Sequence, residues 1–525
     1  MGFNLADLFE SVAAAVGDRE AIVCPAAGGE PEVRLSYREL DERADRLAHV
    51  LTDLGVGRDD TVGLVLRNGN EHLEGMLACF KLRAVPVNVS YRAVAAEVGS
   101  LLADCGAAVV LHEPDLTELV GATGHRAPTL VRGTAWEEAL AQAPAGRVAV
   151  GPRSGQDRYV LYTGGTTGRP KGVVWRQRDL FFAALGGGRP GEAPVTDHAE
   201  VVAAAVTGRR RCLPASPFLH GTGHWSALTT LLGGGTVVAL RDPSFDAARL
   251  LDVIATEAVT TLVLVGDAFG RPLVDALDAW HDVERLSSLN VILSGGATLS
   301  PSTKADLVRH LPWAMVVDGF GASETGGQGQ RVTYPGTVVG MEGHGRFSMG
   351  PETAVLDDEL RPLAPGDGRI GWLARRGHIP VGYLGDADGT ARTFPLSEGV
   401  RWALPGDRAA IGIDGAIVVH GRGSSTINTG GEKVHAEEVE AAVRAHPAVL
   451  DAVVVGVPDD RWGEVVTAVV SVRNGRSLTV QDVVEHCRPA LAGYKLPRRL
   501  IVVDEVVRAT SGKPDLRWAR AAAAP

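Results

Sequence analysis

Hydrophobic and polar positions along this chain follow a helical period in some stretches and a strand-like one in others. Residues 4–17 place their apolar side chains on one helical face, with Asn4 as a cap and Gly17 as a stop. The segment Ser36-Tyr37-Arg38-Glu39 has the form of a capping box. It predicts a second helix that runs as far as Gly55.

Short apolar runs that end in glycine or a turn separate the predicted helices. One more helix is predicted at 71–84. The alternation of helices with buried strands predicts an α/β fold of mostly parallel sheets covered by helices. It also predicts binding loops at the carboxyl ends of the strands. The expected strands are 61–66, 86–89, 236–240, 261–266 and 290–296.

The pattern changes near residue 400. A strand at 415–421 leads into a polar stretch rich in glycine, serine and threonine. The remaining C-terminal segment, about a hundred residues long, has the usual size of a small domain. Its expected elements are helices at 436–449 and 480–491 and strands at 451–457 and 464–472. We therefore expect an N-terminal domain at 1–421 and a small α+β domain at 422–525.

Composition narrows the class of protein. A chain of 525 residues exceeds one core, and its net charge of −11 argues against a nucleic-acid-binding surface. Five scattered cysteines without a C-x-x-C pair favour buried, reduced thiols in a cytoplasmic protein. The N-terminus lacks a basic region, which excludes a signal peptide, and no apolar run is long enough to span a bilayer. A glycosylation sequence at Asn88-Val89-Ser90 is interpreted as a chance match.

The stretch LYTGGTTGRPKGVVW, residues 161–175, carries the clearest chemical signal. Its glycines let backbone amides approach a ligand closely, and its threonine hydroxyls and Lys171 complete a site for polyphosphate. It is not a Walker loop, because Arg169 and Pro170 separate Gly168 from Lys171.

This loop resembles the signature Y-T-S-G-T-T-G-x-P-K-G of the adenylate-forming superfamily, which includes acyl-CoA synthetases, nonribosomal adenylation domains and luciferases. Further segments resemble the later motifs of that family in the right order. They are SGGA (294–297), GFGASETG (319–326), WALPGD (402–407), GRGSSTINTGGEKVHAEEVE (421–440) and TSGKPDLR (510–517). The chain departs from the usual motifs at Gly164, Phe320, Ser323, Pro405, Ser425 and Ala436, with His435 just before the last.

The resemblance implies a role for each motif. The threonines and amides of the loop would hold the β- and γ-phosphates of ATP beside Lys171, and Glu324 with Thr163 would ligate Mg2+. Asp407 would bind both ribose hydroxyls and Phe320 would stack on the purine. The residues expected to contact the nucleotide or CoA are Thr163, Gly164, Gly165, Thr166, Thr167, Gly168, Gly295, Gly296, Ala297, Gly319, Phe320, Gly321, Ala322, Ser323, Asp407, Arg422, Gly430 and Gly431.

Catalysis is expected to depend on Lys513, which would stabilise the charge that builds between the acid and the α-phosphate. In PFLHGTGHW (217–225), two interpretations of His220 are open: it would gate the acyl pocket, or it is a core histidine whose hydrogen bonds are satisfied. Trp225 could equally be a residue of the hydrophobic core. In members of this family the small domain rotates between the two half-reactions. Ser424 occupies the hinge position, and the rotation would bring in the 429–433 loop for the thiol substrate.

The resemblance thus implies an ATP- and Mg2+-dependent acyl-CoA ligase that forms acyl-AMP. RRGHIPVGY (375–383) resembles fatty-acid and sterol-side-chain CoA ligases, and the chain has no carrier domain, which favours free CoA. One alternative is a natural-product enzyme with another acceptor, such as a carrier protein or an amine, or with an unusual acid such as nitrite. Another is a catalytically silent nucleotide-binding protein. The oligomeric state stays open, with a homodimer as one option.

Overall fold

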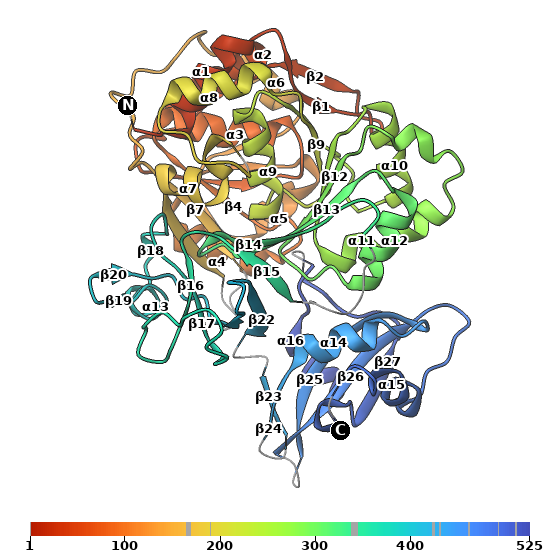
Figure 1. Cartoon of the computed structure of the whole chain (residues 1–525). Coiled ribbons are helices and arrows are strands. Elements are labelled where there is room, and N and C mark those ends of the chain that lie inside the picture. The colour runs from red at the N-terminus through yellow and green to blue at the C-terminus, as the bar shows by residue number, and fades with distance from the viewer. Residues whose placement is uncertain are drawn as a thin grey trace.

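The computed structural model describes residues 2–163, 170–189, 191–337, 345–422, 426–429, 432–459, 463–491, 493–509 and 512–524. Figure 1 shows a large part that extends to β22 (Ile417–Arg422) and a small part, below it in this view, that runs from β23 (Thr426–Thr429) to α16 (Leu516–Ala523). This division into a large α/β part and a small C-terminal domain confirms the predicted fold class.

One sheet of the large part carries the strands on either side of the predicted phosphate loop. Parallel pairing joins β6 to β5, β5 to β3, β3 to β4 and β4 to β7, whereas β8 and β18 are antiparallel. In spatial order its strands are β18 (Gly382–Tyr383), β8 (Lys171–Arg176), β7 (Arg158–Thr163), β4 (Val85–Asn88), β3 (Thr61–Val65), β5 (Ala107–His112) and β6 (Thr129–Val131).

A second, longer sheet holds the other predicted parallel strands. Its strands are parallel from β1 to β13. The pairings from β13 to β16 at one edge are antiparallel, and so is the pairing of β1 with β2 at the other edge. In spatial order its strands are β16 (Thr353–Leu356), β17 (Gly371–Arg375), β21 (Asp407–Ile411), β22 (Ile417–Arg422), β15 (Arg346–Met349), β14 (Gly326–Thr333), β13 (Met315–Ala322), β12 (Val291–Gly295), β11 (Thr261–Leu264), β9 (Arg211–Pro214), β10 (Thr236–Val238), β1 (Glu20–Cys24) and β2 (Val33–Ser36). A separate hairpin pairs β19 (Leu396–Ser397) with β20 (Val400–Arg401).

Helices cover both sheets, and their starts follow the capping chemistry that the sequence predicts. The Asn4 side chain accepts hydrogen bonds from two backbone amides at the start of α1, and Ser36 with Glu39 forms the capping box of α2. The helices of the large part are α1 (Leu5–Val16), α2 (Tyr37–Asp53), α3 (Asn70–Leu82), α4 (Ala95–Cys105), α5 (Thr117–Ala122), α6 (Thr134–Gln142), α7 (Gln177–Ala184), α8 (His198–Thr207), α9 (Gly221–Leu232), α10 (Ala247–Thr256), α11 (Gly266–Asp278), α12 (Pro301–His310) and α13 (Ala387–Thr393).

In the described part of the small domain, three helices pack on a sheet separate from those of the large part. Two apolar clusters, one on each side of the long β25–β26 ribbon, give it an independent core. Its strands are β23 (Thr426–Thr429), β24 (Glu432–His435), β25 (Val449–Asp459), β26 (Gly463–Val472) and β27 (Arg499–Val503), and its helices are α14 (Ala436–Arg444), α15 (Val480–Cys487) and α16 (Leu516–Ala523).

Two helices of the small domain end earlier than the sequence pattern predicts. α14 stops at Arg444 rather than continuing to residue 449, and α15 stops at Cys487 rather than 491. Pro447 and Pro489 explain both differences. Proline has no amide hydrogen, and it disfavours the helical conformation of the residue before it.

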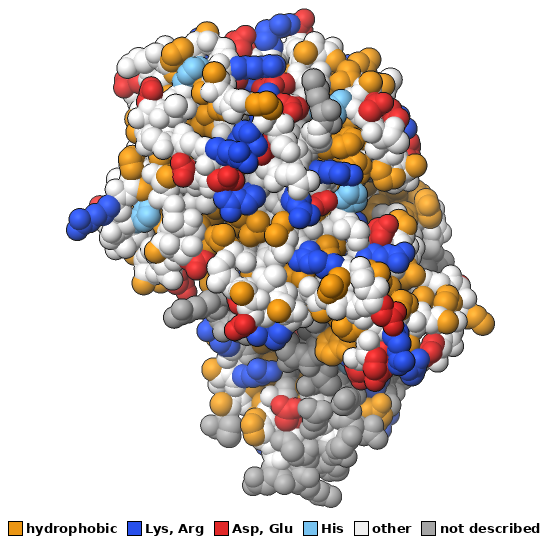
Figure 2. All heavy atoms as spheres, turned by 90° about the vertical axis from the view of Figure 1, so that its left-hand side faces the viewer, with side chains coloured by type: hydrophobic (Ala, Val, Ile, Leu, Met, Phe, Trp, Pro, Cys, Tyr) orange, Lys and Arg blue, Asp and Glu red, His pale blue; other side chains and the backbone are white. Residues whose placement is uncertain are grey.

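All five cysteines are free and buried, as the sequence predicts. Burial raises the pKa of the Cys24 thiol to about 12 and those of Cys105, Cys212 and Cys487 to about 11. On the face shown in Figure 2, acidic and basic side chains are interspersed. No helix in the described part of the chain combines the length and the apolar character that a membrane-spanning segment needs.

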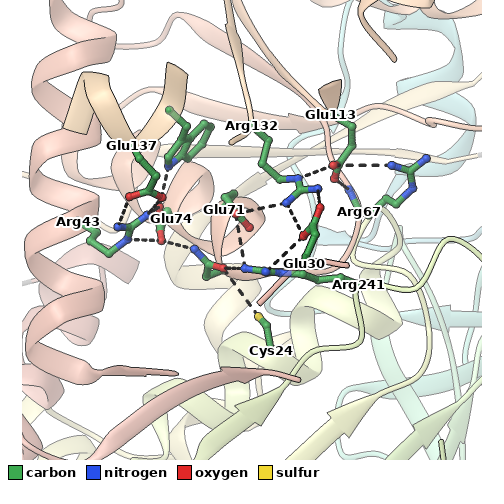
Figure 3. A network of polar contacts seen from close by, with 12 residues as sticks. Cys24, Glu30, Arg43, Arg67, Glu71, Glu74, Glu113, Arg132, Glu137 and Arg241 are labelled. Atoms are coloured by element: carbon green, nitrogen blue, oxygen red, sulfur yellow. Dashed lines mark hydrogen bonds and ion pairs between the residues drawn. The ribbon is translucent and has the colours of Figure 1, made fainter. Parts of the chain in front are cut away.

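Buried ion pairs connect the helices of the large part. Figure 3 shows Glu74 on α3, whose carboxylate lies beside the guanidinium of Arg43. The indole of Trp136 is a further partner of this carboxylate. The Glu74 side chain is 0% exposed and accepts hydrogen bonds from Arg43 Nε at 2.7 Å, Asn70 Nδ2 at 2.7 Å and Trp136 Nε1 at 3.0 Å. A buried carboxylate needs such a set of donors to offset its loss of hydration.

Candidate functional site

Two antiparallel strands flank the predicted phosphate loop. β7 ends at Thr163 and β8 begins at Lys171, and these two residues are paired in the ladder. Thr163 and Lys171 therefore stand opposite each other at the same end of the sheet. The predicted contacts at Gly164, Gly165, Thr166, Thr167 and Gly168 lie outside the described residues.

The two motifs predicted around the base lie on adjacent strand ends. Gly295 at the end of β12 pairs with Gly319 on β13, which places the 294–297 and 319–324 segments side by side. Trp175 on β8 donates a hydrogen bond from its indole to the carbonyl of Ser323 at 3.0 Å. This bond joins the strand that begins at Lys171 to the motif that contains Glu324.

Lys171 and Glu324 both contact Tyr383, for which no role was predicted from the sequence. Lys171 Nζ donates to Asp386 Oδ2 at 2.9 Å and lies 4.8 Å from the centre of the Tyr383 ring. The Tyr383 hydroxyl donates to Glu324 Oε1 at 2.9 Å. The hydrogen bond from Lys171 is the main reason that the pKa of Asp386 lies below its usual value.

Asp407 and Arg422 are also neighbours, although they are fifteen positions apart in the sequence. The backbones of the two residues pair between β21 and β22, and Asp407 is buried. Phe320 packs on an apolar cluster that includes Ala409, two residues after Asp407. Phe347 lies beside it, with ring centres 5.5 Å apart. The predicted ribose and purine residues thus occupy one region, while their contacts to a nucleotide stay a prediction.

The turn that carries Lys513 packs against the large part. A Cβ atom added to Gly512 would lie 3.0 Å from Val265 Cγ1, and a Cβ atom added to Gly296 would lie 3.8 Å from the same atom. Val265 therefore lies beside both the C-terminal turn and the 294–297 segment. Gly512 has a φ of 73°, a backbone conformation that favours glycine, and the Lys513 side chain is exposed.

Four predicted residues of the domain connection lie outside the described residues: Ser424, Ser425, Gly430 and Gly431. Ala436 is the first residue of α14, a position where both proline and alanine suit a helix. That departure from the family pattern is therefore compatible with the local structure.

In the candidate acyl segment, His224 is buried, and its two ring nitrogens contact the carbonyl of Phe218 and the hydroxyl of Tyr159. His220 is half-buried and immediately precedes α9. Trp225 donates from Nε1 to the Tyr159 hydroxyl at 3.0 Å, and that hydroxyl contacts His224 Nε2. This contact favours the interpretation of Trp225 as a core residue, and so does its packing against the hydrophobic core of the large part.

His224 and His72 lie side by side in this core, with ring centres 6.5 Å apart. Burial disfavours the charged imidazole, so the pKa of His224 falls to about 4 and that of His72 to about 3. Both pKa values lie below the ordinary value of 6.5. The two residues thus stay neutral in the folded protein at neutral pH.

We expect the free energy of unfolding to fall as the pH drops from about 6.5 to about 4. The unfolded chain takes up protons at both histidines in this window, while the folded chain does not. Each group contributes a slope of up to about 1.4 kcal/mol per pH unit. Urea unfolding of the wild type and of His224→Gln across this range measures the slope, with the exposed His281→Gln as control. An unchanged slope in His224→Gln would contradict the assignment.

Asn88 connects the phosphate-loop strand to the candidate acyl segment. Its Nδ2 donates to the carbonyl of Leu219 at 2.5 Å and to that of Tyr162 at 3.2 Å, and its Oδ1 accepts from the Tyr162 amide at 2.9 Å. Tyr162 precedes Thr163, and Leu219 precedes His220. The side-chain amide of Asn88, which would carry a glycan, is buried and already donates these hydrogen bonds. This agrees with the interpretation of the glycosylation sequence as a chance match.

The sequence model of the AMP-binding enzyme family matches residues 9–383, and that of the AMP-binding enzyme C-terminal domain matches residues 438–513. The chain belongs to the AMP-binding enzyme family. The family predicted from the loop and the later motifs is thereby confirmed.

Relatives of this family member match it from end to end. It is 40% identical to the medium-chain acyl-CoA ligase Mig of Mycobacterium avium, covering 99% of this chain and 98% of the relative. It is 38% identical to the 3-oxocholest-4-en-26-oate–CoA ligase of Rhodococcus rhodochrous, covering 99% and 96%. Among solved structures, ATP-bound MatB from Rhodopseudomonas palustris superposes with a TM-score of 0.82 at 25% identity, covering 99% of both chains.

Proposed function

We propose that this protein activates a carboxylic acid with ATP and transfers the acyl group to CoA. In the first step a carboxylate oxygen attacks the α-phosphorus of ATP, which gives acyl-AMP and releases pyrophosphate. In the second step the CoA thiol attacks the acyl carbonyl, which gives acyl-CoA and releases AMP. The predicted class, an AMP-forming acid–thiol ligase, is confirmed by relatives of that class that match the full chain.

The observation that carries the proposal is the gathering of oppositely charged motif residues at one end of the sheets. Lys171 and Glu324 both contact Tyr383, and the turn that holds Lys513 packs beside the adjacent 294–297 segment. Adenylation needs cationic groups around a triphosphate and a carboxylate that holds the divalent ion. We assign Lys171 to the phosphates, Asp407 to the ribose and Lys513 to the charge that develops in the transition state.

The residues of the site fit Mg2+. Glu324 and Thr163 offer carboxylate and hydroxyl oxygens, which a hard cation prefers. In the described part of the chain, no group of three or more His, Cys, Asp or Glu side chains gathers to hold a metal. That suits Mg2+, which typically takes one or two carboxylates together with substrate phosphates. When bound, it would neutralise phosphate charge, with Glu324 and Thr163 as its protein ligands.

The two steps are proposed to use two orientations of the small domain. We place the boundary close to Arg422, the last residue of β22, and the hinge at Ser424. In the first orientation Lys513 faces the acid and the α-phosphate. In the second, the 429–433 segment replaces it, and Gly430 and Gly431 leave space for the pantetheine arm of CoA. Support comes from the separate apolar cores of the two parts.

The acid is proposed to be an aliphatic one of medium or long chain, or a sterol side chain, because full-length relatives are named as ligases of such acids. We place the reaction in the cytoplasm, in agreement with five buried thiols and no disulfide among them. Whether the enzyme works as a monomer or a homodimer is measured by light scattering of the purified protein.

The experiment that tests the function is acid-dependent exchange of labelled pyrophosphate into ATP across a panel of acids, with mass spectrometry of the products. We expect exchange with aliphatic acids, and AMP plus acyl-CoA once CoA is added. Exchange without any thioester would favour another acceptor, such as an amine or a carrier protein. Dependence on nitrite would favour diazotisation. Tight ATP binding with no turnover of any acid would contradict the proposal and favour a silent binding protein.

A further inference from the structure

Tyr383 contacts both of the charged residues that the proposed reaction places around the phosphates and the metal ion. The face of its ring lies 4.8 Å from Lys171 Nζ, and its hydroxyl donates to Glu324 Oε1 at 2.9 Å. A cation over an aromatic face and a hydrogen bond to a carboxylate are both favourable contacts. One side chain therefore touches a cation and an anion in two different ways.

The position of Tyr383 is fixed by the strand that Lys171 begins. Tyr383 lies on β18, which pairs with β8 in the register Tyr383 to Val173. The backbone amide of Tyr383 donates to Thr390 Oγ1 at 2.9 Å, and its ring packs edge-on against Phe394 with centres 5.7 Å apart. These contacts hold the ring independently of Lys171 and Glu324.

Lys171 and Glu324 carry opposite charges and adjoin the same side chain. In the absence of other partners, their attraction would draw the ammonium onto the carboxylate. Asp386 gives Lys171 a different partner at 2.9 Å. Asp386 is itself fixed, because its other oxygen caps α13 by accepting from the Gly389 amide at 2.7 Å.

We propose that Tyr383 and Asp386 are positioning residues that keep Lys171 and Glu324 apart. Tyr383 orients the Glu324 carboxylate through its hydroxyl and supports the lysine on its ring, and Asp386 holds the lysine away from the carboxylate. Glu324 then remains available to Mg2+ and Lys171 to the phosphates. This inference rests on the proposed function, since it assumes that Glu324 binds the metal ion.

The test measures ATP binding to the full-length protein without acid or CoA, by calorimetry with and without Mg2+. Tyr383→Phe keeps the ring and removes the hydroxyl. We expect it to raise the Mg2+ concentration needed for half of the Mg2+-dependent gain in affinity by about tenfold. Affinity for ATP without Mg2+ should stay unchanged, because Lys171 keeps its contact with the ring. Tyr494→Phe, on the surface of the small domain, is the matched control.

Asp386→Asn tests the second half of the proposal. The amide keeps the helix cap but loses the charge that holds Lys171, so the lysine should pair with Glu324 and compete with Mg2+. We expect the Mg2+ requirement to rise by about fivefold to tenfold in this variant. When Lys171 is first replaced by methionine, Asp386→Asn should have no further effect on the Mg2+ requirement, because the competing cation is gone.

Two results would overturn the proposal in different ways. An unchanged Mg2+ requirement in both Tyr383→Phe and Asp386→Asn, with a normal Mg2+-dependent gain in the wild type, would overturn the positioning role alone. A wild type that binds ATP equally well with and without Mg2+ would overturn the metal site, and the positioning role with it. Circular dichroism and the melting temperature of each variant separate these outcomes from a loss of folding.

Discussion

Lys513→Ala is expected to slow the formation of acyl-AMP by about 10²-fold to 10³-fold, the usual cost of removing one donor aimed at developing negative charge. The turn that carries Lys513 packs through Gly512 on Val265 at the end of β11, beside the 294–297 segment. The side chain is exposed, so its removal leaves no cavity. Pyrophosphate exchange with a saturating acid measures this half-reaction.

The second half-reaction separates the proposed role of Lys513 from general damage. Thioester formation from supplied acyl-AMP and CoA should keep most of its wild-type rate in Lys513→Ala, because the proposed rotation withdraws this lysine. Arg517→Ala removes an exposed cation four residues later and should change neither step. Equal losses in both half-reactions would contradict the role assigned to Lys513.

Glu74→Ala is expected to lower the free energy of unfolding by about 3–5 kcal/mol, the range for breaking a buried ion pair. The substitution removes an acceptor shared by Arg43 (Figure 3), Asn70 and Trp136. The buried donors of Asn70 and Trp136 and the half-buried Arg43 then lose a partner, and each buried donor left unsatisfied adds its own desolvation cost. Urea unfolding at neutral pH measures the change.

Arg43 offers an internal control for this prediction. The same guanidinium also pairs with Glu137 at 2.6 Å, but the Glu137 side chain is 55% exposed. Because water replaces a lost partner at an exposed site, Glu137→Ala should cost only about 0–1 kcal/mol. A similar loss in the free energy of unfolding for both variants would show that burial does not determine how much these ion pairs stabilise the protein.

Local signals in the sequence were enough to predict most of the framework. Capping residues located the starts of α1 and α2, and short apolar runs located β3, β11 and β12. These features depend on neighbours within a few positions. The ends of α14 and α15 were predicted too late because the apolar pattern continues past the proline that terminates each helix.

The supporting residues of the site could not be predicted in the same way. Asn88 contacts Tyr162 and Leu219, which are 74 and 131 positions away, and Tyr383 contacts Glu324 across 59 positions. Nothing local distinguishes such an asparagine or tyrosine from any other. The motif residues were identified because the family resemblance supplied their order. The partners that hold them became visible only when the folded sheets brought them together.

The buried cysteines give this enzyme a practical advantage for experiments. None of the five native thiols is exposed, and four have a pKa of about 11 or 12, so each forms little thiolate at neutral pH. A cysteine introduced on the surface of each domain would therefore react with maleimide dyes much faster than any native one. A dye pair attached in this way would report the distance between the two domains during turnover.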